Sequence, residues 1–549
     1  MRLVSWRLYL LSVVSAFLQL LPFPLGGPVP AWRRYVCWIC LVPLLYALNQ
    51  RDRSGAALGP WRSALISYLC GVVWFAGNCY WIYQTMFLYG GLPAPASASI
   101  LVLFSLYLGL YFALFGVCFA LILRWKGAVT ALTLSPLLWV AVELARTQIT
   151  GFPWDLLGYT QLENTWLTPL APWTGVMGLS LVVGTGNMLW LWRPSSAPRW
   201  TRSIGPLLAT ALAVLSYFGS SAVEPPRKAT SAAILVQDNL EVGAEAQGPR
   251  ENQPELLESL FARTLHPRVT DGVSQLSQLN HLGHIFNGVP RPDIVLWPEA
   301  PTSFSDADQQ FREVMSRVAL ATDAPVAVDA LGQGTQPDKG GRVDEFASAS
   351  FFLPDGTYAG RYDKMHLVPF GEYTPYKQLF FFAGHLLDGL NFVPGTRRTL
   401  FSANGHRFGV FICYESIFGD EIRHFALSGA QVLVNLSDDG WYGDTSAPWE
   451  HLDMARMRAI ENRRWLLRDT NTGVTTSIDP DGRLVAQLPR HIRGAIEVPF
   501  AFSQEITFYT RFGDWIGWLC AIAVISVLLG SYLQQRYPRP PSHKAALPG

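Results

Sequence analysis

Eight long apolar segments constrain this 549-residue chain more than any other feature of its sequence. A helix that crosses a bilayer needs about 20 mostly apolar residues, because hydrocarbon offers no partner for unpaired backbone groups and a helix satisfies its own. The segments predict membrane helices at residues 8–24, 35–49, 63–87, 97–123, 127–146, 166–192, 204–222 and 513–534. The first is interpreted as an uncleaved helix rather than a secretion signal, because six more spans follow it closely.

The composition agrees with a membrane protein. Hydrophobic residues make up 50% of the chain and charged residues only 15%, which is low for a soluble protein. The formal net charge is +1, so the overall charge gives no reason to expect nucleic acid or a polyanionic substrate as a partner.

The distribution of Lys and Arg predicts the orientation of the helices, since short loops rich in these residues stay in the cytoplasm. One set of alternating loops contains Arg2, Arg7, Arg51, Arg53, Arg62, Arg124, Lys126, Arg193, Arg199, Arg202, Arg536, Arg539 and Lys544. The other set contains Arg33, Arg34 and Arg146. We therefore expect both termini in the cytoplasm. The hydrophilic stretch that follows the seventh helix then lies on the opposite face, which in a bacterium is the periplasm or the outer surface.

That stretch, residues 223–511, is predicted to form one external α/β domain between a bundle at 1–222 and a last helix and tail at 512–549. Short β-branched or aromatic runs that end in turn or polar residues predict strands at 231–239, 293–300, 324–330, 346–356, 407–416 and 430–439. Apolar residues at helical spacing predict helices at 311–322 and 447–464.

Cys413 is the one cysteine of seven that lies outside the predicted membrane helices. Structural cysteines in an oxidising compartment normally occur in pairs, so Cys413 has no disulfide role within this domain. It closes the apolar run FGVFI and is followed by polar residues, which indicates a strand that ends in a turn or helix start, where N–H groups favour a thiolate. The alternative is a small buried hydrophobic residue.

A nucleophilic thiol needs a base for its proton and a cation or N–H donors for the developing oxyanion. The domain offers Glu299 at the end of DIVLWPEA and Lys364 in RYDKMHLVPFGEY, although either residue alone could be an ordinary surface charge. The ten histidines include no HExxH motif, and no CxxC pair lies outside the apolar segments. We therefore expect neither a metal nor another cofactor.

The motifs WPE, YDKMHLVPFGEY and CYE, in this order, resemble the Glu, Lys, Cys triad of the nitrilase (carbon–nitrogen hydrolase) superfamily. Within it, the chain is most similar to the membrane family of apolipoprotein N-acyltransferases. That family resemblance extends to the apolar spans, to TGFPW at 150–154 and to MARMRA at 454–459. It implies several membrane spans, an external αββα sandwich of the nitrilase type and one final helix, which agrees with the eight transmembrane helices predicted from the apolar segments.

The resemblance also implies roles for individual residues. Glu299 is the general base, Lys364 stabilises the tetrahedral intermediate, and Cys413 is the nucleophile that becomes acylated. Supporting or substrate-binding positions of the family are matched by Glu372, Tyr414, Glu415, Trp441 and Arg464.

The sequence departs from the family pattern in two places. A tryptophan that often follows shortly after the position of Gln237 is missing, which leaves part of substrate recognition open. The usual SNDAWFG reads SDDGWYG, with Asp438 for Asn and Tyr442 for Phe.

The function that the resemblance implies is phospholipid-dependent N-acylation in the bacterial inner membrane, with the catalytic domain on the periplasmic face. The thiol would take a fatty acyl chain as a thioester and pass it to the α-amino group of the N-terminal diacylglyceryl-cysteine of a lipoprotein. We expect a monomer, with no nucleic acid partner. The apolar segment 379–387 is either a core helix or a lid that dips toward lipid.

Two other functions remain open at the level of sequence. One is a membrane-tethered amidase of the nitrilase type, which would hydrolyse an external amide with the same triad. The other is a membrane bundle that carries a binding domain, which predicts no reactive thiol. Seven helices ahead of the domain are more than an anchor requires, and this favours lipid chemistry.

Overall fold

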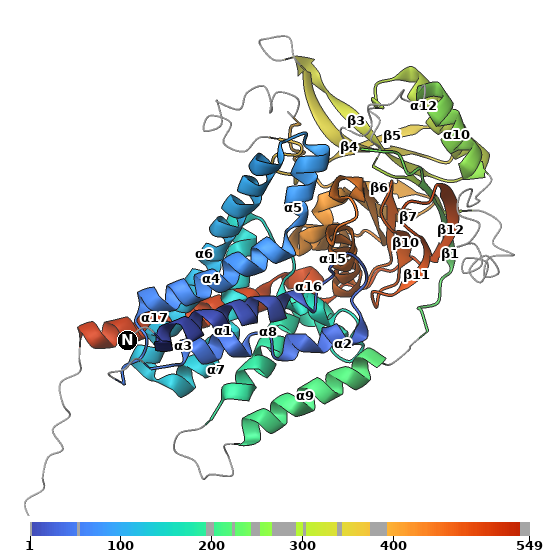
Figure 1. The fold of residues 1–549 in the computed structure, drawn as a ribbon. Coiled ribbons are helices and arrows are strands. Elements are labelled where there is room, and N and C mark those ends of the chain that lie inside the picture. The colour runs from blue at the N-terminus through green and yellow to red at the C-terminus, as the bar shows by residue number, and fades with distance from the viewer. Residues whose placement is uncertain are drawn as a thin grey trace, which may run out of the picture.

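The computed structural model describes residues 3–51, 55–193, 203–221, 225–242, 253–265, 292–299, 304–337, 343–373 and 392–537. The apolar segment 379–387 lies outside these ranges, so the expectation of a lid stays a prediction. Residues 243–252, which follow shortly after Gln237, also lie outside them. Figure 1 shows a bundle of helices at one end of the molecule and an α/β domain at the other.

The bundle is built from the N-terminal helices and the last helix of the chain (Figure 1). Its elements are α1 Leu3–Leu20, α2 Ala31–Arg34, η1 Tyr35–Trp38, α3 Val42–Leu48, α4 Pro60–Asn78, α5 Trp81–Gln84, η2 Thr85–Tyr89, α6 Ala94–Lys126, α7 Ala128–Ala145, α8 Ala171–Leu191, α9 Ile204–Ser221 and α17 Trp515–Arg536. Between α7 and α8 lie the short turns η3 Arg146–Thr150, η4 Leu157–Gln161 and η5 Thr168–Leu170.

The expectation of membrane-crossing helices is confirmed, but not the count of eight. Five stretches of the described residues are long and apolar enough to cross a membrane, or six if the bent pair Pro60–Asn78 and Trp81–Tyr89 forms one span. The apolar helices Trp6–Leu20 and Ile204–Ser220 are shorter than the others. A predicted span that is broken by a bend or a short turn can be recognised from composition, but its break cannot.

Small residues bring α4 and α6 into close contact, as is common where membrane helices associate. A Cβ atom on Gly71 would lie 2.7 Å from the ring of Phe112, and one on Gly109 would lie 2.8 Å from Val72. At Gly116 the neighbour is the backbone itself, because a Cβ there would lie 2.4 Å from the carbonyl oxygen of Ser63.

In the part of the α/β domain that the structure describes, two six-stranded sheets carry helices on their outer faces. The first sheet has the order β12-β1-β2-β3-β4-β5, with β1 Ser231–Gln237, β2 Ile294–Trp297, β3 Val326–Pro337, β4 Val343–Phe352, β5 Tyr358–Asp363 and β12 Gly494–Phe500. The second has the order β11-β10-β9-β8-β7-β6, with β6 Leu400–Ala403, β7 His406–Ile412, β8 Val432–Ser437, β9 Leu466–Thr470, β10 Thr475–Ile478 and β11 Leu484–Leu488.

The two sheets pack face to face through apolar side chains, such as Phe351 of the first sheet against Phe401 and Phe408 of the second. Helices α10 Gln253–Leu265 and α12 Gln309–Thr322 cover the outer face of the first sheet. Helices α14 Gly419–Leu427 and α15 Ala447–Asn462 cover the second. The described part of the domain is thus an αββα sandwich, as the resemblance implied.

Parallel pairing places the carboxyl ends of the central strands at a common edge of each sheet. In the first sheet β1, β2 and β3 run parallel, and in the second β7, β8 and β9 do. Side chains that follow these strands can therefore meet, as ligands and catalytic groups commonly do at this edge of α/β sheets.

Helix α15 lies between the second sheet and the bundle. One of its faces contributes Leu452, Ala455 and Ala459 to the core of the domain, and another contributes Met454 and Met457 to the core of the bundle. The domain is thus packed directly on the membrane helices.

We expect Gly116→Ala to lower the stability of the protein by about 1–3 kcal/mol, because the added methyl group must displace the backbone of α4. Gly530→Ala in α17 is the control, because nothing lies within 4 Å of a Cβ at that position. Thermal unfolding in detergent should show a lower Tm for the first variant and an unchanged or slightly higher Tm for the second. Equal effects of the two substitutions would contradict the close contact of α4 and α6.

Candidate active site

Cys413 lies at a sharp turn directly after β7, where it begins the short helix η9, Cys413–Ile417. Its φ is +47°, in the left-handed region that residues other than glycine rarely adopt. Such a conformation costs of the order of 1–3 kcal/mol and persists only where the surroundings enforce it. The side chain is buried. The sequence folds this way because an apolar strand ends here and the chain must turn at once into η9.

Three side chains from separate strands converge at this turn. Lys364 follows β5, and its fully buried ammonium group donates to Oε1 of Glu372 at 2.5 Å. Oε1 of Glu299, which follows β2, lies 3.6 Å from the same nitrogen. The Cys413 side chain lies close enough to Glu299 and Lys364 for the charge of each to shift the pKa of its thiol. The structure therefore brings together the base, the cation and the thiol that the sequence predicts.

Burial and neighbouring charges set the protonation states of Cys413, Glu299 and Lys364. Burial, followed by the negative charge of Glu299, raises the pKa of the Cys413 thiol well above its ordinary value, although Lys364 opposes the shift. Burial also raises the pKa of Glu299, against the attraction of Lys364. Burial alone would lower the pKa of Lys364, but Glu372 and Glu299 outweigh it and keep the ammonium charged. A protonated thiol thus lies beside a carboxylate and a fixed positive charge.

Glu415 connects the turn at Cys413 with the loop that carries Lys364. Its Oε1 accepts hydrogen bonds from the hydroxyl of Tyr362 at 2.7 Å and from the backbone N–H groups of Met365 and His366 at 2.8 and 3.1 Å. Its Oε2 accepts from the N–H of Ile412 at 2.8 Å. One buried carboxylate thereby fixes the end of β7 relative to the end of β5, which sets the relative position of thiol and ammonium.

Asp438 completes the surroundings of Glu299 from the end of β8. Its backbone N–H donates to Oε2 of Glu299 at 2.8 Å. Its own carboxyl group accepts from the N–H of Gly440 at 2.9 Å and from the amide of Asn471 at 3.0 Å. Burial, followed by the charge of Glu299, raises the pKa of Asp438 to about 8, so this group is largely neutral at pH 7.

The remaining predicted residues lie in different places. Tyr414 is buried in η9, with its ring 5.3 Å from that of Phe418. Trp441 is 42% exposed, and its ring meets that of Tyr89 edge-on at 6.4 Å. Its carbonyl oxygen accepts from Thr85 at 3.0 Å, which joins the domain to η2 of the bundle.

Arg464 is not brought to the thiol. Its guanidinium group is buried and donates to the backbone carbonyl oxygens of Ala430 at 2.8 Å and Asn462 at 3.3 Å, and to that of Glu505. These contacts hold the approach to β8 against the segment that follows β12. The sequence showed the motif that contains Arg464. It could not show that the Arg464 side chain points away from the thiol, because the direction of a side chain depends on tertiary packing.

A cavity of about 510 Å³ lies between the domain and the bundle, and Tyr414, the residue after Cys413, is part of its lining. On the domain side it is lined by Met365, His366, Leu367, Pro369, Tyr373, Pro394, Tyr414, Ile417, Phe418, Gly419, Asp420, Glu421 and Arg458. On the membrane side it is lined by Thr147, Gln148, Thr150, Gly151, Pro153, Leu156, Tyr159, Val176, Met177, Tyr509 and Asp514. The loop after Lys364 and the helix that begins at Cys413 form part of its walls, whereas Glu299, Lys364 and Cys413 do not line it.

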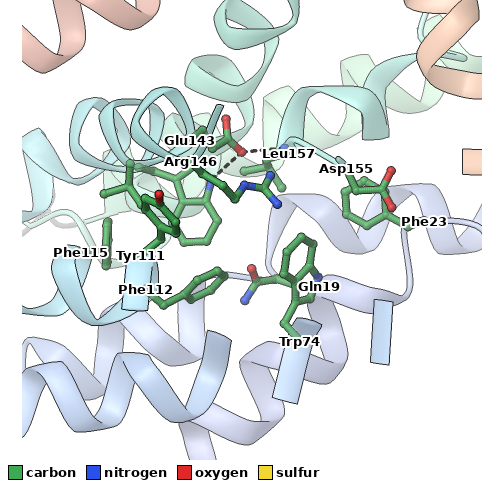
Figure 2. A pocket seen from close by; sticks show the side chains of 12 residues that line it. Gln19, Phe23, Trp74, Tyr111, Phe112, Phe115, Glu143, Arg146, Asp155 and Leu157 are labelled. Carbon is green, nitrogen blue, oxygen red and sulfur yellow. Dashed lines mark hydrogen bonds between the residues drawn. The ribbon is translucent and has the colours of Figure 1, made fainter. Parts of the chain in front are cut away.

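A second cavity lies within the bundle and has a volume of only about 30 Å³. Figure 2 shows the guanidinium group of Arg146 pointing into it, between Trp74 and Asp155. Nη1 of Arg146 and Oε2 of Glu143 are buried there without a hydrogen-bond partner among the described residues. The space suits one or two water molecules rather than a lipid.

The TGFPW segment makes a contact that sequence reasoning missed. Trp154 is fully buried, and its indole N–H donates to Oε2 of Glu450 on α15 at 2.6 Å. The motif itself was a signal, but its partner lies almost three hundred positions further along the chain. Among the residues that the structure describes, no group of three or more His, Cys, Asp or Glu side chains could hold a metal ion.

Two known protein families match the chain, and together they cover most of it. The N-terminal domain of apolipoprotein N-acyltransferase matches residues 15–189, and the carbon–nitrogen hydrolase family matches residues 291–504. Among individual proteins, the apolipoprotein N-acyltransferase of Geobacter metallireducens is 31% identical over 95% of both chains.

Other relatives agree with this match. The apolipoprotein N-acyltransferase of Bordetella bronchiseptica is 30% identical over 98% of both chains, and that of Haemophilus influenzae is 29% identical over 96% of this chain and 94% of its own. A solved structure of an amidase from Nesterenkonia sp. is 17% identical, covers 51% of this chain and 93% of its own, and has a TM-score of 0.34.

The high pKa of Asp438 predicts how stability changes with pH. The folded state keeps this proton up to about pH 8, whereas the unfolded chain loses it near pH 4, so stability falls as the pH rises between these values. We expect Asp438→Asn to lose less stability than the unchanged protein between pH 5 and pH 8. Thermal unfolding in detergent at several pH values measures the two slopes, and equal slopes would show that Asp438 is ionised in the folded protein.

Proposed function

The chain belongs to the apolipoprotein N-acyltransferase family, and we propose that Glu299, Lys364 and Cys413 carry out its acyl transfer. The chain is therefore an acyltransferase built on a carbon–nitrogen hydrolase domain. The observation that supports these roles is the position of the buried Lys364 ammonium, 3.6 Å from Glu299 and beside the only described cysteine of the α/β domain. A fixed cation at this place serves a reaction in which negative charge develops on the carbonyl oxygen of the group that the sulfur attacks.

In the first half of the reaction, Glu299 takes the proton from the Cys413 thiol as the sulfur attacks the carbonyl carbon of a phospholipid ester. The negative charge that forms on the carbonyl oxygen is stabilised by Lys364, which stays protonated. The carbon–oxygen bond of the ester then breaks, and Glu299 returns its proton to the departing oxygen. A lysophospholipid leaves, and the fatty acyl chain remains on Cys413 as a thioester.

In the second half, the α-amino group of the N-terminal diacylglyceryl-cysteine of a lipoprotein attacks the thioester carbon. An α-amine with a pKa near 7.7–8.0 is partly neutral at physiological pH, so Glu299 needs to remove only one proton from the attacking nitrogen. The carbon–sulfur bond breaks, the thiol regains a proton, and the lipoprotein carries a third acyl chain joined by an amide bond.

The cavity between domain and bundle supports a lipid as the donor. Its apolar lining, which includes Leu156, Val176, Met177, Leu367 and Phe418, suits an acyl chain that arrives from the bilayer. We assign Tyr414 to the wall that guides this chain toward the thiol. Glu372 and Glu415 hold Lys364 and its loop in place, whereas Trp441 and Arg464 support the site through contacts with the bundle and with the segment after β12.

We further propose that all eight apolar helices cross the inner membrane, with both termini in the cytoplasm and the domain at 223–511 in the periplasm, and that the enzyme acts as a monomer. The hydrogen bond from Nζ of Lys126 to Gln534 at 2.8 Å supports this arrangement, because it places the basic end of α6 beside the C-terminal end of α17. Trp154 and Tyr159 belong to the loop between α7 and α8, and their contacts with the domain place this loop at the opposite end of the bundle.

The competing function is that of a membrane-tethered amidase, which would use the same triad to hydrolyse a small external amide. It differs in the acceptor, because water rather than an amine would resolve the acyl-enzyme. The persistence of a fatty acyl thioester in water therefore distinguishes the two.

We expect the intact protein to gain the mass of one fatty acyl group on Cys413 after incubation with phospholipid vesicles, as measured by mass spectrometry. Cys413→Ala should show no adduct and at least a 10³-fold loss of transfer to a diacylated lipopeptide, because no nucleophile remains. Normal turnover by this variant would remove Cys413 from the mechanism. An adduct that water removes as fast as it forms, without transfer to the peptide, would favour the amidase.

Glu299→Gln should slow formation of the thioester by about 10²–10⁴-fold, because the amide cannot take the thiol proton. The rate of appearance of the acyl adduct in a single turnover measures this step. Glu258→Gln on the exposed surface of α10 is the control and should leave the rate unchanged. Unchanged acylation in the Glu299 variant would argue against this residue as the base.

A further inference from the structure

A buried polar network lies behind the turn at Cys413, on the side of its carbonyl group. Nε2 of His451, on α15, lies 3.0 Å from the carbonyl oxygen of Cys413 and 2.7 Å from the hydroxyl of Ser416. The amide of Asn435, on β8, donates to the same carbonyl oxygen at 3.4 Å. None of these side chains is exposed to solvent. The carbonyl group of the strained residue Cys413 is therefore held by side chains of two elements, α15 and β8.

Arg468, on β9, positions both of these donors. It donates to both carboxylate oxygens of Asp439, at 2.9 and 2.8 Å, and to the side-chain oxygen of Asn435. The same guanidinium group lies 3.0 Å from Nδ1 of His451, which is also 2.9 Å from Asp439. A single buried ion pair thus orients the imidazole and the amide that contact the Cys413 carbonyl.

The protonation of His451 follows from its neighbours. A carbonyl oxygen can only accept a hydrogen bond, so Nε2 must carry a proton to bind Cys413. Arg468 can only donate, and it lies within reach of Nδ1. Burial, together with Arg468, lowers the pKa of His451, which keeps the ring neutral at pH 7. With its proton on Nε2, the ring donates to the carbonyl oxygen and accepts from Arg468 at Nδ1. Asp439 can only accept, so it orients this ring through Arg468 and not through a hydrogen bond of its own to Nδ1.

The strain at Cys413 explains why such a network is needed. The left-handed φ of +47° turns the side chain toward Glu299 and Lys364, but a cysteine does not hold this conformation unaided. Glu415 fixes the N–H of the preceding residue, Ile412, and the His451 network fixes the carbonyl group that follows. The two anchors on either side of Cys413 leave its peptide groups little freedom to relax.

We propose that His451, oriented by Asp439 and Arg468, is a positioning residue that holds the Cys413 carbonyl and thereby keeps the thiol aimed at its base and its cation. This inference rests on the proposed role of Cys413 as nucleophile. His451 contacts the carbonyl oxygen and Ser416, it does not line the cavity, and it takes no proton from the sulfur. Its effect on the reaction is exerted through the backbone.

The test compares His451→Ala with His451→Gln and with Thr476→Val in the full-length protein in detergent. Glutamine can place an N–H near the position of Nε2, whereas alanine cannot. Thr476, on β10, donates a buried hydrogen bond to the carbonyl oxygen of Ala486 at 2.9 Å, away from β7, β8 and η9. Its substitution removes one buried hydrogen bond without touching the network, so it controls for a general loss of stability.

Two measurements are made on each variant. The rate at which iodoacetamide alkylates Cys413, read from the peptide by mass spectrometry, reports on the thiol without any acyl transfer. The kcat and the KM for phospholipid report on the reaction. We expect His451→Ala to lower the alkylation rate and kcat together, by about 10²-fold, because a displacement of about 1 Å at a reacting group costs that much. The KM should stay within about twofold.

His451→Gln should regain at least tenfold of the loss, and Thr476→Val should leave both rates unchanged despite a lower Tm. Alkylation of Cys413 at the normal rate in His451→Ala would overturn the proposal, as would losses in all three variants that follow their Tm. If His451 controls alkylation but no acyl adduct forms on Cys413 in the unchanged protein, the positioning role stands and the proposed function fails. The two failures are therefore distinguishable.

Discussion

The buried Lys364 ammonium is the charge around which the rest of the site is arranged. It lies between Glu372, at 2.5 Å, and Glu299, at 3.6 Å, and has no exposure to solvent. Removing one partner of such a group costs several kcal/mol, because an uncompensated charge then stays in a medium of low polarity. Both carboxylates must therefore be in place for the lysine to stay charged, and Glu299 can give up its negative charge to a proton only while Glu372 remains. This division supports the proposal that Glu299 acts as the base while Glu372 holds Lys364 in place.

Strain in the backbone of Cys413 is the second constraint on the site. The anchors on each side of Cys413 come from different parts of the fold, since Glu415 accepts from residues that follow β5 and His451 belongs to a helix that packs on the bundle. Trp154 of the bundle stacks on the His451 ring, with 6.2 Å between centroids and 19° between planes. The geometry of the Cys413 thiol therefore depends on both sheets, on α15 and on the membrane part together.

The sequence predicted the parts of the site that follow from local patterns. Glu299, Lys364 and Cys413 each end or follow a run of strand character, and the parallel pairing of β2 with β3 and of β7 with β8 brings such ends together. It could not predict where Arg464 points, because that depends on which carbonyl groups lie nearby in the folded chain. It also could not identify His451, which occupies an ordinary position in a helical pattern. The break of α8 at Gly175, where φ is +64°, was equally invisible, since the apolar run continues through it.

The interface between domain and bundle shows why the two parts form one enzyme rather than a domain on an anchor. Arg458 and Glu461, both fully buried on α15, form an ion pair at 3.0 Å. Arg458 also donates to the hydroxyl of Tyr159, and Glu461 accepts from the N–H of Val176 at the break in α8, each at 3.0 Å. Further hydrogen bonds make a buried pair of this kind tolerable, and here the bundle supplies one to each residue, although Nε of Arg458 and Oε2 of Glu461 have no hydrogen-bond partner among the described residues. Because Arg458, Tyr159 and Val176 also line the large cavity, the contacts that join the two parts are among those that shape this cavity.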